Sequence, residues 1–324
     1  MAQPGDVLDA SNAWPELDYA AGRETYETLH LLTQIVGKIR LSRTPSLNHS
    51  WHVTLYACAR GLTTSPIPYG EGAFEICFDF IAHRLIVETS DGQRWHMPLR
   101  SSTIADLYAT LMAGLAGLGV RLAINETPNE LPDPIRFNED RLHGHYDPDQ
   151  AHRFWEALLR IDRVFKLFRT GFLGKCSPVH FFWGSFDLAV TRFSGRRAPL
   201  HPGGVPYLPD SVVREAYSHE VSSAGFWPGG GGIDYPAFYS YAYPAPPGFS
   251  SAVLRPQRAF FSTDLQEFIL PYDCVRTAPA PDEALLQFLQ STYDAAAVGA
   301  AWDRASLECG PGEIGRPRAI SAPL

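Results

Sequence analysis

The sequence predicts an α+β protein of two similar halves, in each of which an antiparallel sheet packs against long helices. A long stretch with apolar residues at helical spacing opens each half, over residues 20–41 and 147–170. Short runs rich in β-branched and aromatic residues follow each stretch, as expected of strands. A further helix closes each half. This echo is consistent with an internal duplication.

In the first half the element pattern is helix, four strands, helix. Over residues 74–80 the sequence Phe-Glu-Ile-Cys-Phe-Asp-Phe alternates between mostly apolar inner residues and outer residues, as in a strand. Asp91-Gly92 is a tight-turn signal, and Ser102 or Thr103 can cap the last helix. We expect helices over residues 20–41 and 102–118, and strands over 51–61, 74–80, 84–89 and 93–97.

A boundary is predicted within residues 125–134, which carry three prolines. Asp147-Pro148 is a strong helix start, with Asp as N-cap and Pro at the first helical position. We expect helices over residues 147–170 and 282–304, and strands over 179–183, 186–193, 213–226, 238–243 and 267–275. The predicted units are residues 14–130 and 131–308, with flexible tails at 1–13 and 309–324.

Composition narrows the classes of function. The apolar share of 45% and the charged share of 19% indicate a globular chain. A net charge of −8 disfavours nucleic acid as a partner. The five cysteines lie far apart, without a CxxC pair, which is typical of reduced thiols. The N-terminus is no secretory signal, and the most apolar stretch, 104–120, is too short to span a bilayer. We therefore expect a soluble, cytoplasmic protein whose partner is a small molecule.

Five motifs together resemble an uncharacterised bacterial family, a domain of unknown function. They are NHSWHVTLYACARGLTTSPIPYG, SPVHFFWGSFDLAVTRFSGR, EAYSHEVSSAGFWPGG, FYSYAYP and FLQSTY. The resemblance spans residues 14–304 and implies a cytosolic bacterial protein in which the whole chain is one family unit. It implies no activity, so the chemistry must be argued from the residues.

Histidines at strand ends and in loops suggest a metal site. Imidazole with carboxylate is the ligand set expected for Zn or non-haem Fe. The candidate ligands are His180, His201, His219 and Glu220. His219 and Glu220 face opposite ways in a regular strand, and no HExxH-type motif is present. Ordinary hydrogen-bonded histidines are the competing interpretation.

Tyrosines alternate at Tyr239, Tyr241 and Tyr243, so their phenols share one face of a strand. Phenols in a pocket can donate hydrogen bonds or act as acids, although cross-strand packing explains them equally well. We take Tyr239 and Tyr241, with His180 and His219, as the candidate catalytic residues.

Four residues are candidates for binding the substrate. Trp183 and Trp227 would supply aromatic walls, and Arg192 and Arg196 would hold an anionic group. The four glycines after Trp227 indicate either a gate over a pocket or a tolerated surface loop.

Basic residues also recur along the helix over 147–170. They are Arg153, Arg160, Arg163, Lys166 and Arg169. The set is either a solvated helix face or a collector of an anionic substrate.

The leading hypothesis is a small-molecule enzyme, metal-dependent if the histidine cluster binds Zn or Fe. The rival is a non-catalytic module that encloses a small ligand in an aromatic-lined cavity, which the 12% aromatic content also favours. A third class, a scaffold for protein partners, would expose an apolar patch instead.

Overall fold

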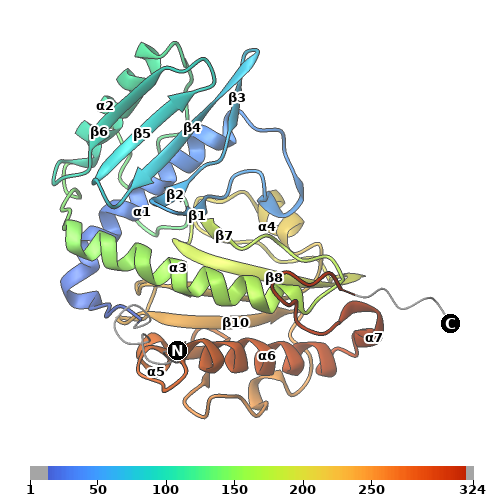
Figure 1. Cartoon of the computed structure of the whole chain (residues 1–324). Coiled ribbons are helices and arrows are strands. Elements are labelled where there is room, and N and C mark those ends of the chain that lie inside the picture. Colours follow the sequence, from blue (N-terminus) through green and yellow to red (C-terminus); the bar gives the residue numbers. More distant parts are fainter. Residues whose placement is uncertain (1–13, 319–324) are drawn as a thin grey trace, which may run out of the picture.

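Two six-stranded antiparallel sheets and the helices that cover them confirm the predicted α+β class (Figure 1). The computed structural model describes residues 14–318, so residues 1–13 and 319–324 of the predicted tails lie outside the described residues. The internal duplication is not confirmed, because the strand orders of the two sheets differ.

The first sheet, sheet B, belongs to the first half of the chain. Its strands are β1 (Tyr56–Cys58), β2 (Gly61–Thr63), β4 (Gly72–Asp79), β5 (Arg84–Thr89) and β6 (Arg94–Pro98), in that order, with β3 (Ile67–Tyr69) paired to β4. The alternating Phe74, Ile76 and Phe78 are buried, as the pattern predicts. Helix α2 (Ile104–Gly117), capped by Thr103, packs on β6 and on α1 (Tyr19–Leu41).

The predicted strand over 51–61 is wrong in its first part. A short 3₁₀ turn at Asn48–Ser50 and a second turn precede a strand that begins only at Tyr56. The N–H groups of Trp51 and Val53 donate to the carbonyls of Asn48 and Ser50 at 3.4 and 3.2 Å, so the first residues of the predicted strand form local turns instead of a strand ladder.

The second sheet, sheet A, has two long helices across one face. Its strands, in order, are β11 (Phe260–Ser262), β12 (Glu267–Pro271), β10 (Ala237–Tyr243), β9 (His219–Trp227), β8 (Asp187–Arg197) and β7 (His180–Phe182). Helices α3 (Pro148–Thr170) and α6 (Pro281–Gly299) lie side by side over β8, β9 and β10 (Figure 1). The Asp147 carboxylate caps α3 as predicted, accepting from the N–H groups of Asp149 and Gln150 at 2.8 and 3.1 Å.

Three predicted boundaries in the second half need correction. Helix α4 (Asp210–Ala216) takes the place of the first residues of the strand predicted over 213–226. Two of its residues are β-branched valines, but only Val213 is buried. The strand over 267–275 stops at Pro271, which has no N–H for the ladder, and α5 (Tyr272–Arg276) follows. The closing helix ends at Gly299, before α7 (Arg304–Leu307).

The two sheets meet at their short edge strands. Leu55 and Phe181 exchange backbone hydrogen bonds of 2.8 and 2.7 Å across the gap between β1 and β7. Close by, the indole of Trp183 packs on Gly37 of α1 and donates to the Val53 carbonyl at 2.9 Å. A single apolar core cluster runs through both halves around this joint.

Part of the predicted C-terminal tail lies against the end of α3. The N–H of Cys309 donates to the Gly171 carbonyl at 3.2 Å, and that of Gly312 to the Thr170 hydroxyl at 2.9 Å. These bonds hold residues 309–312 in place beside α3. None of the helices within residues 14–318 is both long and apolar enough to cross a membrane.

The joint between the sheets can be tested at Gly37. A Cβ there would lie 2.2 Å from the Trp183 ring, so Gly37→Ala should lower the free energy of unfolding by about 2 kcal/mol, within the range of 1–3 kcal/mol for overpacked cores. Gly117→Ala is the matched control, since no atom lies within 4 Å of its added Cβ. It should raise stability by up to about 1 kcal/mol. Urea unfolding measures both, and equal effects would contradict the close packing at Gly37.

Candidate functional site

The face of sheet A turned away from α3 and α6 carries a group of buried polar side chains, among them His180, Asp187 and Ser223. Strand pairing sets Ala189 opposite both His180 and Gly225, and Tyr239 opposite Gly225. Alternation then assigns one set of side chains to this face, which we call the polar face. Its members are His180, Phe182, Asp187, Ala189, Thr191, Phe193, His219, Val221, Ser223, Gly225, Trp227, Ala237, Tyr239, Tyr241, Tyr243, Glu267 and Ile269.

The opposite face of sheet A is mostly apolar and packs on the helices, with Arg192, Ser222 and Ser240 as its buried polar members. Leu188, Phe226, Phe238 and Phe268 on this side are all fully buried in the main core. The sheet therefore separates an apolar layer from a polar one. The centre of the polar face has small side chains: Thr191 and Ser223 hydrogen-bond across the strands at 2.8 Å.

A tyrosine and a carboxylate form the central contact of the polar face. The ring of Tyr239 lies over Gly225, where a Cβ would come within 2.3 Å of it, and its hydroxyl donates to Asp187 Oδ2. Trp227 packs on Tyr239 with ring centroids 4.7 Å apart, and Tyr241 stacks nearly parallel to it at 6.1 Å. The predicted common face of Tyr239 and Tyr241 is confirmed by the pairing register.

Segments outside the sheet complete the polar face. Ile233, from the glycine-rich loop, packs on Tyr239 and Ile269, so this loop covers one end of the face. The hydroxyl of Tyr217, which follows α4, donates to that of Tyr241 at 3.0 Å.

Burial moves the pKa values of the carboxyl groups here toward neutrality. Burial, with the nearby Glu130 carboxylate, raises the pKa of Asp187 to about 7, although the Tyr239 hydrogen bond opposes the shift. Burial and the Asp187 charge raise the pKa of Glu267 to about 7. Burial also raises the pKa of Glu130, against the hydrogen bond from Ser185. Groups with pKa values near 7 can both accept and donate protons at neutral pH.

Four polar atoms of the polar face are buried without a hydrogen-bond partner. They are His180 Nδ1 and Nε2, Asp187 Oδ1 and Trp227 Nε1. Within residues 14–318 only ten such side-chain atoms occur, so the polar face holds a large share of them. Buried polar atoms in native proteins nearly always bind a partner, such as water or a ligand.

His180 is fully buried and uncharged. Burial lowers its pKa to about 3, and the charges of Arg40 and Arg169 act in the same direction. The ring packs edge-on against Phe182 at 4.6 Å and against Trp51 at 6.3 Å. A neutral imidazole has one donor and one acceptor nitrogen, so His180 can offer either to a polar molecule.

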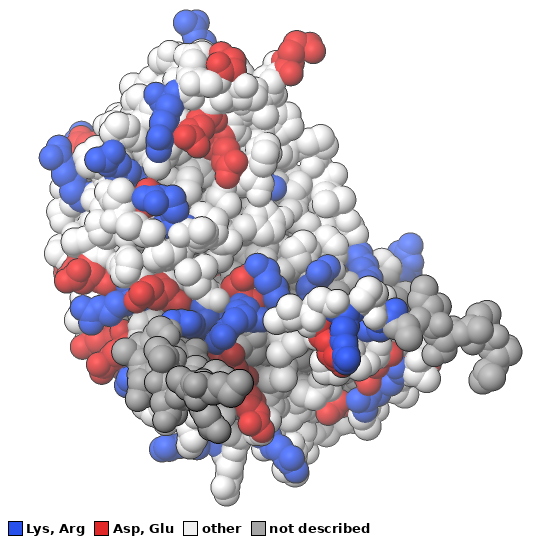
Figure 2. All heavy atoms as spheres, viewed as in Figure 1, with Lys and Arg blue, Asp and Glu red and all other residues white. Residues whose placement is uncertain are grey.

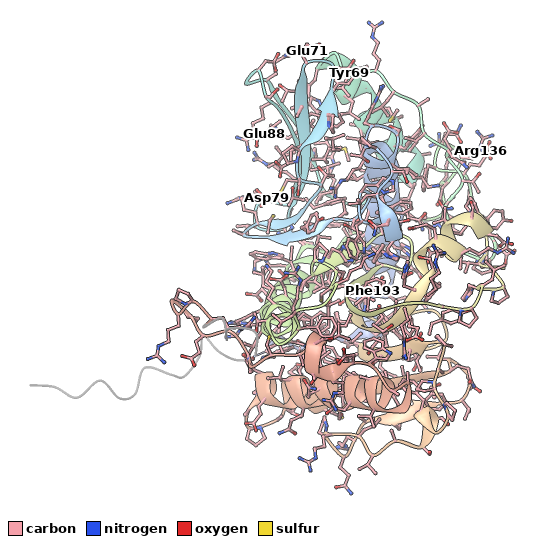
Figure 3. The ribbon with its side chains drawn as sticks, turned by 90° about the vertical axis from the view of Figure 1, so that its right-hand side faces the viewer. Tyr69, Glu71, Asp79, Glu88, Arg136 and Phe193 are labelled. Atoms are coloured by element: carbon pink, nitrogen blue, oxygen red, sulfur yellow. The ribbon has the colours of Figure 1, made fainter. Side chains whose placement is uncertain are left out.

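A second polar group lies at the end of the face beside Phe193. Figure 3, in which Phe193 is labelled, shows this residue at mid-height, below the strands of sheet B and above α6. His49 packs on Phe193 at 4.5 Å and lies 6.3 Å from the His219 ring. Its Nδ1 donates to the Ala216 carbonyl at 3.0 Å, so its Nε2 accepts from Lys175 Nζ at 2.6 Å.

The predicted metal ligands are not brought together. His201 stacks between Tyr217 and Tyr243, with centroids 4.7 and 5.0 Å away, while His219 lies beside His49. The Glu220 carboxylate is paired with Arg196. Across residues 14–318 no group of three or more His, Cys, Asp or Glu side chains could hold a metal ion. The separation arises because the ligands come from different loops and strands, whose spacing in the sequence does not fix their distances.

Three of the four predicted substrate-binding residues have other contacts. Trp183 packs against α1, as described above. Arg196 donates to Glu220 at 2.8 Å and to the Ala300 carbonyl at 2.6 Å. Arg192 is only 2% exposed, lies on the α3 side of the sheet and stacks on the rings of Phe168 and Tyr293 at 3.5 and 4.4 Å. Trp227 alone of the four lies on the polar face.

Sequence reasoning missed the carboxyl groups. Asp187 and Glu267 are single acids inside otherwise apolar runs, SFDLAV and QEFILP. Such an isolated acid in a buried strand is the signal that could have found them, because burying a charge is costly and therefore rare without a purpose.

The fold and this face define an α+β protein of two antiparallel sheets with one polar, carboxylate-bearing sheet face. The chain belongs to the family of unknown function DUF5996, whose model matches residues 14–309. This confirms the resemblance to a domain of unknown function that covers nearly the whole chain. Comparison with curated proteins and with solved structures gives no match.

The burial of Asp187 predicts an unusual dependence of stability on pH. Between its ordinary pKa of 3.8 and about 7, the folded state keeps a proton that the unfolded state has lost, so this group destabilises the fold as pH rises. Asp187→Asn should therefore gain stability relative to wild type from about pH 4 to 7, by up to about 4 kcal/mol, and the gain should stay constant above pH 7. Urea unfolding across this range measures it.

Asp264→Asn is the control, at an exposed carboxyl in the turn between β11 and β12. Its difference from wild type should not vary with pH in the same way. A flat difference for Asp187→Asn would show that the Asp187 carboxyl is not buried as described.

Proposed function

We propose that the polar face is the active site of an enzyme that acts on a small polar molecule by proton transfer. The observation that carries the proposal is the Asp187–Tyr239 hydrogen bond, in which the carboxyl group has a pKa of about 7 and a second oxygen without a partner. A titratable pair with a strongly shifted pKa, buried among unpartnered polar atoms, is characteristic of catalytic sites.

The stability cost of Asp187 supports a functional role. A carboxyl group 4% exposed, opposite Phe182 in the strand pairing, could be replaced by an amide with the Tyr239 hydrogen bond retained. An acid at such a position destabilises the fold at neutral pH, which is common where function requires the group. Near pH 7, Asp187 divides its time between a carboxylate that accepts a proton and an acid that donates one.

The other polar atoms provide contacts for a substrate. His180 offers a neutral imidazole, Trp227 an indole N–H, and Asp187 Oδ1 an acceptor. Burial raises the pKa of Tyr239 well above 10, so its phenol stays protonated and acts as a donor. The Tyr217–Tyr241 hydroxyl pair supports a second donor on the same face.

The proposal assigns catalysis to side chains of this face and assigns no residues to Zn or Fe. The rival function, a non-catalytic ligand-binding module, uses the same aromatic residues and unpartnered atoms. The two functions differ only in whether a bound molecule is converted, so one experiment separates them.

We also place the protein in the cytoplasm of a bacterial cell. All five cysteines are free, and Cys58 Sγ lies 3.9 Å from Cys77 Sγ. Two thiols this close persist in a reducing compartment, which supports the location.

The test is a screen of small polar metabolites by thermal shift, followed by mass spectrometry of each stabilising compound after incubation with the protein. Wild type should convert at least one compound, with a rate that changes around pH 7. Asp187→Asn should still be stabilised by that compound but turn it over about 100-fold more slowly or worse, the size typical of general acid–base groups. The inflection near pH 7 should disappear.

Tyr239→Phe should weaken both stabilisation by the compound and turnover, because it removes the donor to Asp187. Tyr69→Phe is the matched control, a tyrosine of sheet B that also donates a hydrogen bond, to the Gly119 carbonyl. Binding without conversion by wild type would establish the binding module instead. Equal thermal shifts in wild type, Asp187→Asn and Tyr239→Phe would place the ligand elsewhere and overturn the site.

A further inference from the structure

A strongly basic hollow lies at the C-terminal end of α3, on the other side of sheet A from the polar face. Its volume is about 730 Å³, within the range of small-molecule sites. Four cationic side chains line it, and none of its lining residues is acidic: Lys166 and Arg169 come from α3, and Arg316 and Arg318 from the C-terminal segment.

Two of the four cations are paired with acids outside the lining. Lys166 binds Asp162 at 2.6 Å, and Arg316 binds Glu313 at 2.8 Å. Arg169 and Arg318 have no acidic partner among residues 14–318. Both donate to backbone carbonyls, and Arg169 also hydrogen-bonds to the Cys176 thiol. The hollow therefore has a net positive charge even after these pairs are counted.

The end of α3 explains part of this charge but not all of it. Carbonyls at a helix C-terminus carry a partial negative charge, which cations stabilise. Arg318 donates to the Thr170 carbonyl and serves this purpose, whereas Arg169 donates to the carbonyl of Ser177, beyond the helix. Lys166 and Arg316 donate to carboxylates instead, so only one of the four cations bonds to a carbonyl of the helix end itself.

The concentration of cations contrasts with the rest of the molecule. The chain has a net charge of −8, and Figure 2 shows Lys and Arg side chains, with Asp and Glu among them, on the surface at the right-hand side. Guanidinium groups in particular match the oxygens of phosphate, which they bind through two parallel hydrogen bonds. Three of the four cations here are arginines.

We infer that this hollow binds the phosphate groups of a small organic phosphate. Arg169 from α3 and Arg318 from the C-terminal segment both line the hollow and provide the guanidinium contacts, while Lys166 and Arg316 add two further cationic groups to its lining. Cys176 lines the same hollow, and burial raises the pKa of its thiol, so it remains a neutral wall residue that a bound ligand would cover. The inference is independent of the function proposed for the polar face.

The experiment is calorimetric titration of the full-length protein with inorganic pyrophosphate at low ionic strength, where surface charge is least screened. Wild type should bind one pyrophosphate per chain, and affinity should fall steeply as salt is added. Arg169→Gln with Arg318→Gln should weaken binding at least tenfold. Pyrophosphate should also slow alkylation of Cys176 by N-ethylmaleimide, as followed by peptide mass spectrometry.

Arg163→Gln is the matched control. It removes the same charge from the same helix, but Arg163 pairs with Asp282 at 2.7 Å and does not line the hollow. Its affinity for pyrophosphate should stay within twofold of wild type. Lys166→Gln keeps a polar side chain that can donate a hydrogen bond to the buried Asp162, and it should weaken pyrophosphate binding if the double variant does not fold.

Four outcomes would overturn the inference. The first is no heat of binding for pyrophosphate. The second is an equal loss of affinity in Arg163→Gln, which would reduce the cluster to general surface charge. The third is equal competition by sulfate, which would indicate an unspecific anion site. The fourth is tighter binding of a short RNA than of pyrophosphate, which would assign the surface to a nucleic acid.

Discussion

The packing of the Trp183 indole on Gly37 holds the two sheets of this protein together. Only glycine lets the helix approach the ring so closely, and the indole N–H fixes the Val53 carbonyl on the neighbouring segment. Two residues further along, Leu55 pairs through its backbone with Phe181, so the first half of the chain extends the edge of sheet A. The position of β7, and with it the His180 ring, therefore depends on a contact made by α1.

This joint also determines what the polar face can do. The chain turns immediately after Trp183 and enters β8 at Asp187, so the same anchor that positions β7 positions the carboxyl group. On the helix-facing side of the sheet, the burial of leucine and phenylalanine side chains stabilises the fold. On the polar face it leaves an acid with a pKa of about 7 and atoms without partners. One sheet thus combines a stabilising side with a side that lowers stability, as in many catalytic scaffolds.

Much of the fold was predictable because its signals are local. The apolar stripes of α1 and α3, the Asp147 cap and the alternation in β4 and β10 each act within a few residues, and the structure contains them. The predictions were wrong where distant contacts decide the outcome. Residues 213–216 were predicted to begin a strand, yet they form the last turn of a short helix after Pro209.

The site was predictable only in part, for the same physical reason. Alternation fixes which side chains share a face, so Tyr239 and Tyr241 could be paired from the sequence. It does not show which strands become neighbours, and the histidines taken as metal ligands proved to lie in separate environments. Arg192 illustrates the limit: an arginine in a strand suggests anion binding, but the neighbours of this one are aromatic rings from α3 and α6.

The basic residues of α3 lie along one face of the helix but make two different kinds of contact. Arg163 pairs with Asp282 at the start of α6 and so joins the two helices that cover sheet A. One turn further on, Lys166 and Arg169 instead meet the C-terminal segment, which brings two more arginines to the same hollow. Sequence spacing alone gives these residues one role, a charged face. The C-terminal segment lies against the end of α3 and gives Lys166 and Arg169 a second role. Together with Arg316 and Arg318, they line a concave, positively charged site.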